Sequence, residues 1–324
     1  MKNKVTNCFQ IALLIMTFLL FILYPNLCIQ AASTGILQWY QKVLPVLFPF
    51  MILTSVIHLL QYDVLTSKII TKFFPFFKRY SPESSYICTL GFLCGFPMGA
   101  KLVKDAYSNH NINHKEASFL LAFCNNLSPA FFLGIILPVL ERMNSDKVFH
   151  TKIPYIFCMY GIPLLYGIFL QILLEKNQNK SSLQNAEHKL QTTIPFSEAL
   201  DLSLSQNIMP IVKLGCYIMI FQIYGNYLIA LLKKYTFISQ FGCSCACALL
   251  EIVNGSIQFA NQRIHGMVPT AVFFFLLQFG GISCLMQTSI FLQRTDLKLS
   301  KYVLHKLIIG LLSSCSFLIL NIIL

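Results

Sequence analysis

Apolar residues occur along this chain in long runs, most of which are long enough to cross a membrane as a helix. A spanning helix needs about 20 mainly apolar residues. Six runs approach or reach that length, and a seventh does so despite two asparagines near its centre. The pattern predicts seven spanning helices, at residues 11–29, 43–60, 117–140, 153–174, 210–232, 268–292 and 307–324.

Small, polar and charged residues interrupt the apolar pattern at matching places in the two halves of the chain. One interruption lies at 91–101 and its counterpart at 249–256, and each half has a second one further on, at 123–129 and 279–283. Backbone groups at membrane depth survive only where protein or a water-filled cavity covers them. Paired interruptions of this kind therefore indicate the binding site of a secondary transporter at the middle of the membrane.

The distribution of lysine and arginine predicts the orientation. We place the N-terminus in the cytoplasm and let the segments 86–101 and 242–255 each enter and leave on one side of the membrane. Fifteen cations, Lys306 among them, then lie in cytoplasmic segments and seven in external ones, as the positive-inside rule expects. This topology makes the two halves inverted copies, at 43–175 and 197–324, joined by a cytoplasmic linker at 176–196, and it places the C-terminus outside.

The composition excludes a water-soluble globule. Hydrophobic residues make up 56% of the chain and charged residues 11%, against about 25% charged in soluble domains. The net charge of +12 is explained by the loop cations, so no nucleic-acid partner is expected. Most cysteines lie in apolar runs and are interpreted as packing residues. Cys243, Cys245 and Cys247 do not converge on one helix face, so no metal site is predicted.

Three further kinds of segment lie outside the spans of the repeats. Residues 1–30 are interpreted as a retained N-terminal helix, with a cleaved signal peptide as the alternative. The linker is rich in Asn, Gln, Ser and Lys and is predicted to be a mobile connector. Segments 64–77 and 196–206 are too short or too polar to span, and we expect amphipathic helices at the membrane interface.

The first interruption contains a turn motif. Pro97 removes an amide donor and disfavours helix at Phe96, while Gly95 and Gly99 permit backbone conformations that other residues cannot reach. We expect a turn that exposes backbone amides and begins a new helix, whose N-terminus is suited to an anion. Lys101 would add its charge one helical turn later, or would only extend to the cytoplasmic edge of the membrane.

The second interruption of the first half contains three polar residues next to a proline. Asn125, Asn126 and Ser128 lie in an otherwise apolar stretch that stops at Pro129. They either hydrogen-bond a carboxylate or a heterocycle, or only hold helices together.

The second half supplies an acid and further polar residues. Glu251 is the sole acid from 237 to 260. It either takes and releases a proton, binds a coupling Na⁺, or pairs with a buried lysine such as Lys213 or Lys101. The remaining candidates for the lining are Asn254, Ser283 and Gln287, together with Gly280 and Gly281, which permit close backbone approach or tight helix packing.

No hydrolytic or redox constellation is visible in the sequence. The seven histidines lie almost all at segment ends, and no phosphate-binding loop of the Walker type occurs. The chain is therefore not expected to be an enzyme or to use ATP itself. No cofactor is expected apart from a coupling Na⁺ or H⁺.

Four motifs, in order, carry a resemblance to a known family. They are Gly95-Phe-Pro-Met-Gly-Ala-Lys-Leu102, Glu116-Ala with Phe123-Cys-Asn-Asn-Leu-Ser-Pro129, Leu250-Glu-Ile-Val-Asn-Gly255, and Phe279-Gly-Gly-Ile-Ser283 with Gln287. Together they resemble the sporulation integral membrane proteins of the YlbJ type, which carry nucleoside-recognition, or Gate, domains. Phe96 stands where that family has tyrosine.

The resemblance implies an architecture similar to concentrative nucleoside transporters and a role in endospore formation. It also implies transport of dipicolinic acid from the mother cell towards the forespore, in the mother-cell-derived membrane around the forespore. In that reading Lys101 and the group Asn125, Asn126 and Ser128 would hold carboxylates, and Phe96 or Phe123 would stack on the ring.

The sequence therefore favours an all-α, multi-pass membrane protein that moves a small anionic aromatic solute by alternating access of two inverted repeats. The alternatives are a transporter of nucleosides or other small solutes and, in another class, a non-transporting membrane scaffold needed for spore formation. The partners expected are the solute and the lipid bilayer. The sequence leaves open whether the chain forms homo-oligomers.

Overall fold

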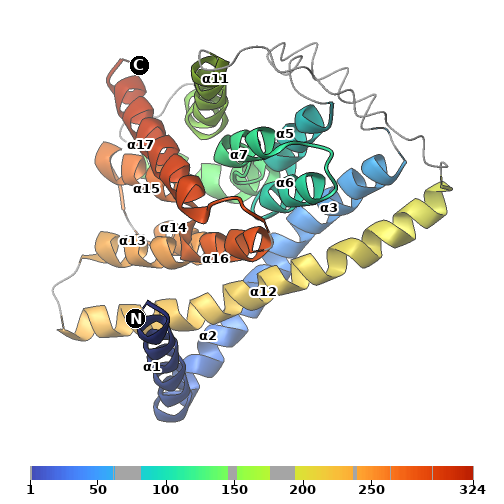
Figure 1. Ribbon diagram of the computed structural model, residues 1–324. Coiled ribbons are helices and arrows are strands. Elements are labelled where there is room, and N and C mark those ends of the chain that lie inside the picture. Colours follow the sequence, from blue (N-terminus) through green and yellow to red (C-terminus); the bar gives the residue numbers. More distant parts are fainter. Residues whose placement is uncertain are drawn as a thin grey trace.

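The computed structural model describes residues 2–60, 62, 82–144, 152–175, 194–235, 239–262, 264–293 and 295–323. Within these ranges every regular element is a helix (Figure 1). The predicted interfacial helix at 64–77 and the linker up to residue 193 lie outside the described residues.

The described chain begins with two helices that meet at a proline. α1 (Lys2–Leu23) ends before Pro25, the first residue of α2 (Pro25–Gln38). Tyr24 between them leaves the helical conformation, with φ −132° and ψ 55°. The predicted span at 11–29 therefore ends too late in the chain. The helix ends at Leu23, because a proline at the first position begins a new helix. α2 instead runs on through η1 (Trp39–Val43) into α3 (Leu44–Leu59).

The rest of the first half consists of a two-helix hairpin, an interrupted helix and a final helix. The predicted single span at 117–140 is wrong, because residues 124–128 are not helical. The elements are α5 (Pro82–Cys94), α6 (Met98–Ser108), α7 (His114–Phe123), α8 (Pro129–Phe131), η3 (Phe132–Ile136), α9 (Leu137–Met143), α10 (Ile153–Ile156), η5 (Phe157–Gly161) and α11 (Ile162–Glu175).

The second half has the same order of elements: a long helix, a two-helix hairpin, an interrupted helix and a final helix. They are α12 (Phe196–Tyr235), α13 (Gln240–Leu250), α14 (Ile252–Asn261), α15 (Met267–Phe279), α16 (Gly281–Leu292) and α17 (Leu299–Ile323). The inverted relation of the two halves stays a prediction.

α12 is one continuous helix of 40 residues that lies along α2 and α3 (Figure 1). The helix predicted at 196–206 is not separate but forms the first turns of α12, and polar residues in and next to this segment pack on α3. Ser203 is buried and donates to the carbonyl oxygen of Ile52 at 2.9 Å, and Asn207 is buried and donates to Ser55 at 2.7 Å.

The three π-helical turns in the described residues share a cause in the sequence. η1, η3 and η5 end at Val43, Ile136 and Gly161, and in each case a proline follows two residues later, at Pro45, Pro138 and Pro163. A proline inside a helix has no amide donor and clashes with the carbonyl of the preceding turn. A π turn widens the helix at that point, so the helix continues through the proline.

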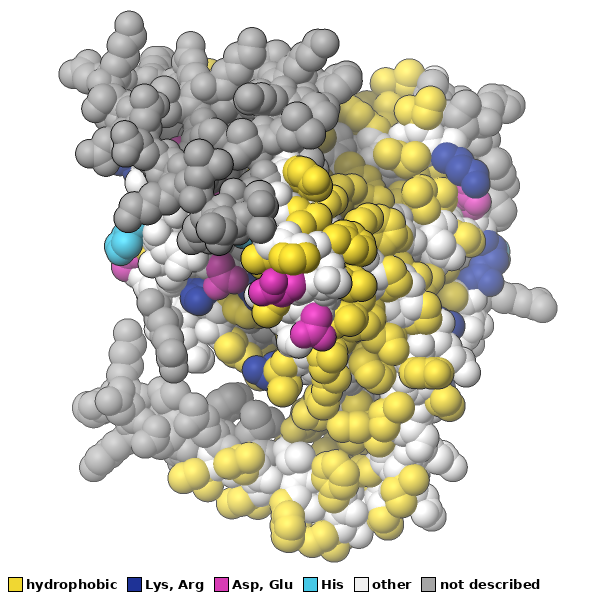
Figure 2. Space-filling view, turned by 90° about the vertical axis from the view of Figure 1, so that its right-hand side faces the viewer, with side chains coloured by type: hydrophobic (Ala, Val, Ile, Leu, Met, Phe, Trp, Pro, Cys, Tyr) yellow, Lys and Arg dark blue, Asp and Glu magenta, His cyan; other side chains and the backbone are white. Residues whose placement is uncertain are grey.

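The surface of the molecule is apolar where a soluble protein would be charged. Exposed side chains include Ile208 and Met209 on α12, at 50% and 58%, and Figure 2 shows hydrophobic side chains gathering in a broad patch on one face. In the described part of the chain, five helices are long and apolar enough to cross a membrane: Pro25–Leu59, Ile153–Leu173, Phe196–Lys234, Met267–Leu292 and Leu299–Ile323. The protein is thus a polytopic α-helical membrane protein.

Candidate functional site

The first interruption is a tight turn between α5 and α6. Gly95 has a φ of +80°, in the left-handed region, and the peptide bond between Phe96 and Pro97 is cis. The amide of Met98 donates to the carbonyl oxygen of Gly95 at 2.9 Å, and α6 begins at Met98. The prediction that glycine and proline end one helix here and begin another is confirmed.

A strip of glycines brings this turn against the second interruption. A Cβ atom on Gly95 would lie 2.7 Å from the amide nitrogen of Ser128, and one on Gly99 would lie 3.0 Å from the Cα atom of Asn125. Gly91 lies as tightly against the carbonyl oxygen of Cys124. These three glycines, spaced four residues apart, allow the non-helical backbone of 124–128 to lie directly on α5 and α6.

The two asparagines of the second interruption are fully buried. Asn126 donates to the carbonyl oxygen of Phe123 at 2.6 Å, which turns its own Oδ1 atom away from that helix end. Asn125 donates to the hydroxyl of Tyr302 at 2.9 Å, and its Oδ1 atom has no hydrogen-bond partner. Ser128 caps α8 by accepting from the amide of Phe131 at 3.3 Å. Of these side-chain atoms, Oδ1 of Asn125 is a buried acceptor without a partner.

Glu251 separates α13 from α14 and caps the second of these helices. Its backbone is extended, with φ −151°, and it is 2% exposed. The two carboxylate oxygens accept from the amides of Val253 and Asn254, at 3.0 and 2.7 Å. Neither Lys101 nor Lys213 forms an ion pair with it in the described part of the chain, and Lys213 is exposed on α12. The carboxylate is therefore held by backbone donors.

Glycines also bring together the two interruptions of the second half. Gly280 and Gly281 have φ values of +80° and +82°. A Cβ atom on Gly281 would lie 2.9 Å from the carbonyl oxygen of Ala248 in α13. The contact is the tight helix packing given as the alternative for this pair, and it joins the α15–α16 break to the α13–α14 hairpin.

The remaining predicted polar residues are buried, and some of their hydrogen-bonding atoms already have partners within the protein. Gln287 donates to Ser283 at 3.2 Å, so these two side chains bond to each other. Asn254 donates to the carbonyl oxygen of Ile218 at 3.4 Å, while its Oδ1 atom has no hydrogen-bond partner. Asn254 thus leaves one acceptor free, as Asn125 does in the first half.

The interruptions of the two halves touch through Phe96. A Cβ atom on Gly280 would lie 3.0 Å from Cζ of Phe96, so the ring of the first-half turn lies against the backbone break of the second half. Phe96 is 7% exposed. The broken segments therefore meet inside the molecule.

Lys306 completes the site and was missed from the sequence. It is fully buried on α17, donates to Oδ1 of Asn126 at 2.9 Å, and has its Nζ atom 4.8 Å from the centre of the Phe96 ring. Its assignment to the cytoplasmic cations is wrong. The signal was available in the helical spacing, because Lys306 shares one face of α17 with the buried residues Tyr302, Ile309 and Ser313.

A cavity of about 440 Å³ lies beside the site. Its walls come from the second half of α3, from α5 and α6, from residues 109 and 111 and from Gln206 of α12. Cys94 and Met98, on either side of the Phe96 turn, belong to its lining, and so does Lys101. Asn125 and Asn126 do not, so Lys101 is separated from the polar group that it was predicted to join.

The two ends of the molecule differ. At the end where α9, α14 and α17 finish, polar contacts tie the halves together: Arg142 donates to the carbonyl oxygen of Ala260, Gly266 donates to that of Met143 at 2.8 Å, and Asn321 donates to Asn144 at 3.0 Å. We call this the α9 end. The opposite end, where α6 finishes and the cavity lies, we call the α6 end.

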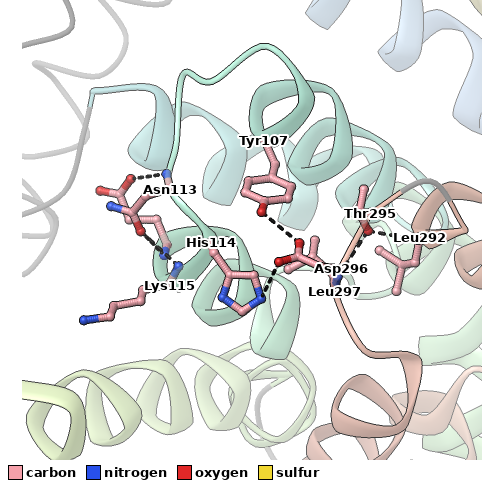
Figure 3. Close-up of polar contacts among 9 residues, drawn as sticks. Tyr107, Asn113, His114, Lys115, Leu292, Thr295, Asp296 and Leu297 are labelled. Carbon is pink, nitrogen blue, oxygen red and sulfur yellow. Dashed lines mark hydrogen bonds and ion pairs between the residues drawn. The ribbon is translucent and has the colours of Figure 1, made fainter.

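A smaller polar cluster joins the halves at the α6 end (Figure 3). Asp296, in the loop before α17, accepts from the hydroxyl of Tyr107 at 2.8 Å and lies 3.6 Å from Nε2 of His114. The hydrogen bond from Tyr107 holds the pKa of Asp296 below its ordinary value, and the charge of His114 acts in the same direction. Asn113 caps α7 beside them. This loop cluster is exposed and lies outside the membrane-spanning helices.

Comparison with known proteins agrees with the resemblance drawn from the four motifs. No family model matches the chain, and no solved structure matches it. The chain is 22% identical to the sporulation integral membrane protein YlbJ of Bacillus subtilis (strain 168), across 95% of its own length and 82% of that protein. This chain is therefore a multi-pass membrane protein similar, along nearly its whole length, to a sporulation integral membrane protein of the YlbJ type.

Proposed function

We propose that the protein transports a small aromatic anion across a membrane during endospore formation, by alternating access, and that dipicolinate is the solute. The observation that supports this most is the contact between interrupted segments of the two halves, where Phe96 meets Gly280. Helix breaks of this kind at membrane depth are found around solute sites. The relative YlbJ supports the assignment to sporulation by its name alone.

The cavity supports a solute of this size. Binding sites for small molecules have volumes of about 300–1,000 Å³, and the cavity beside the Phe96 turn has about 440 Å³. It lies at the α6 end, where the halves also meet through the exposed Asp296 cluster, while buried and backbone hydrogen bonds tie them together at the α9 end. We interpret the structure as a state open towards the α6 end, which is the predicted cytoplasmic side.

Uptake into proteoliposomes tests the proposal. The purified protein is inserted into vesicles and supplied with dipicolinate, uridine or a plain aliphatic dicarboxylate, with and without a Na⁺ or H⁺ gradient. We expect saturable uptake of dipicolinate, and less of the other two solutes. Absence of saturable flux for all three, in correctly inserted protein, would refute transport and favour a scaffold role.

A nucleoside is the second candidate solute, and one observation favours it. The buried Oδ1 atoms of Asn125 and Asn254 have no hydrogen-bond donor, and the amide and hydroxyl groups of a neutral nucleoside would supply donors to both. Uptake of uridine that exceeds that of dipicolinate would decide for this alternative.

A further inference from the structure

We propose that Lys306 binds the carboxylate of the solute and that the solute displaces the Phe96 ring, which covers this lysine. The proposal rests on the proposed function, from which it takes the ligand to be an aromatic anion. It adds a binding residue that the motifs did not include, and it makes this lysine the group that distinguishes charged from neutral ligands.

The surroundings of Lys306 leave its charge incompletely matched. An ammonium group has three N–H donors. The groups that face it are Oδ1 of Asn126 at 2.9 Å and the rings of Phe96 and Tyr302, whose centres lie 4.8 and 6.0 Å from Nζ. No carboxylate lies within ion-pair distance of it in the described part of the chain. A buried ammonium without an anion is costly, so a ligand carboxylate would supply the missing charge.

Glu251 does not provide that charge, although it lies in the same region. Cys284 interacts electrostatically with both Glu251 and Lys306. Both carboxylate oxygens of Glu251 accept backbone amides of α14. The acid is therefore committed to the helix end, and the ammonium remains available.

The neighbours of Lys306 are fixed in position before a ligand arrives. Asn126 is oriented by its bond to the carbonyl oxygen of Phe123, and Tyr302 and Thr288 are both held by Asn125, at 2.9 and 3.4 Å. All four side chains are buried. A carboxylate that reaches the ammonium would meet donors whose geometry is already set, which reduces the entropic cost of binding.

Phe96 covers this group, and the turn that carries it forms part of the cavity wall. Cys94 and Met98, two residues before and after it, line the cavity, whereas the Phe96 ring lies against Gly280 and 4.8 Å from Nζ of Lys306. A solute carboxylate that contacts Nζ would therefore displace this ring, which exchanges an aromatic ring of the protein for that of the ligand.

Equilibrium binding to the full chain in detergent tests the proposal with two matched probes, pyridine-2,6-dicarboxylate and the neutral pyridine-2,6-dimethanol. A charge-assisted hydrogen bond that is lost changes a dissociation constant by about tenfold or more. We expect the dicarboxylate to bind at least about tenfold more tightly than the diol, and Lys306→Gln to reduce this ratio to within about twofold. Lys301→Gln, an exposed lysine on the same helix, is the control and should keep the ratio.

A second variant covers the case in which Lys306→Gln fails to fold. In Asn126→Asp, the new carboxylate would form an ion pair with Lys306 inside the protein. This variant should therefore also abolish the preference for the dicarboxylate, although the lysine is still present. A ratio unchanged in the folded Lys306 or Asn126 variants overturns the proposal, and so does a wild-type protein that does not prefer the dicarboxylate. If the preference for the dicarboxylate depends on Lys306 but no uptake into vesicles occurs, transport is refuted and this proposal stands. If uptake occurs but the preference is the same in the Lys306 variant, this proposal is refuted and transport stands.

Discussion

Gly281 has a backbone conformation with a φ of +82°, and a Cβ atom there would lie 2.9 Å from the carbonyl oxygen of Ala248. Two separate penalties therefore oppose any side chain: the left-handed backbone and the clash with α13. Gly134 in η3 offers the opposite case, because a Cβ atom there would have no neighbour within 4 Å.

We predict that Gly281→Ala lowers the free energy of unfolding by about 2–4 kcal/mol, the sum of the left-handed backbone cost and a core overpacking cost. Gly134→Ala should be neutral or should stabilise by up to about 1 kcal/mol. Thermal unfolding in detergent, compared between the two variants, measures both. Equal effects would contradict the backbone packing described for the second half.

Glu251 yields a prediction that separates its structural role from ion coupling. Glu251→Ala leaves two buried amides of α14 without acceptors and should destabilise by about 1–3 kcal/mol. Glu251→Gln keeps one acceptor and should lose less, with saturable uptake retained. Unfolding and vesicle uptake are measured on the same preparations. Loss of uptake in a stable Glu251→Gln protein would show that the carboxylate carries a proton or Na⁺.

Single residues were predictable where the local chain determines them. Gly95, Pro97, Gly280 and Gly281 end helices through their own backbone preferences, so the sequence alone located these breaks. Lys306 was not predictable from hydropathy, because the apolar run begins after it. Its role depends on Asn126, 180 residues away in sequence, and only the packing of α17 on α7 brings the two together.

At the scale of elements, the interruptions were predicted better than the lengths of the helices. The spans at 153–174 and 268–292 are confirmed with small changes in their ends. α12 begins earlier than its apolar run, because Ser203 and Asn207 find partners on α3 that hydropathy does not represent. Helix ends that depend on such contacts are not encoded in the local pattern.

The loop before α17 yields a prediction about pH. Asp296 has a lowered pKa in the folded protein, so its contacts with Tyr107 and His114 contribute stability above 3.8, the ordinary value, and lose it as the pH falls through the lowered value. Asp296→Asn should therefore lower Tm near neutral pH, and the difference from wild type should shrink as the pH falls below 3.8.

Asp201→Asn serves as the control for this prediction, because Asp201 is exposed on α12. It should leave Tm nearly unchanged at every pH tested. A difference between Asp296→Asn and wild type that stays constant down to the acid limit would show that the carboxylate does not stabilise the loop through its charge.

At the scale of the whole molecule, the α9 end and the α6 end make different demands on a transport cycle. If the solute leaves through the α9 end, the hydrogen bond between Asn144 and Asn321 has to break in each cycle. Cysteines at these two positions, in a background without the native cysteines, can be joined by a short bifunctional thiol reagent with a reducible link, which locks this end.

We expect cross-linking of the Asn144→Cys, Asn321→Cys protein to stop uptake into vesicles and reduction of the link to restore it. Each single cysteine variant, treated in the same way, shows whether the reagent itself has an effect. Unchanged uptake by a protein shown to be cross-linked would mean that the α9 end stays closed throughout the cycle.

The length of α12 has a consequence for how a solute first meets the protein. Even at a tilt of about 40°, a hydrocarbon layer of about 30 Å takes up about 26 residues of helix, so about 14 of its 40 residues extend beyond the layer. The polar first turns of the helix are the part suited to that position, and they include Gln206 at the cavity wall. The mouth of the cavity then stands among lipid headgroups, so an anionic solute has to pass their phosphates before it reaches the protein.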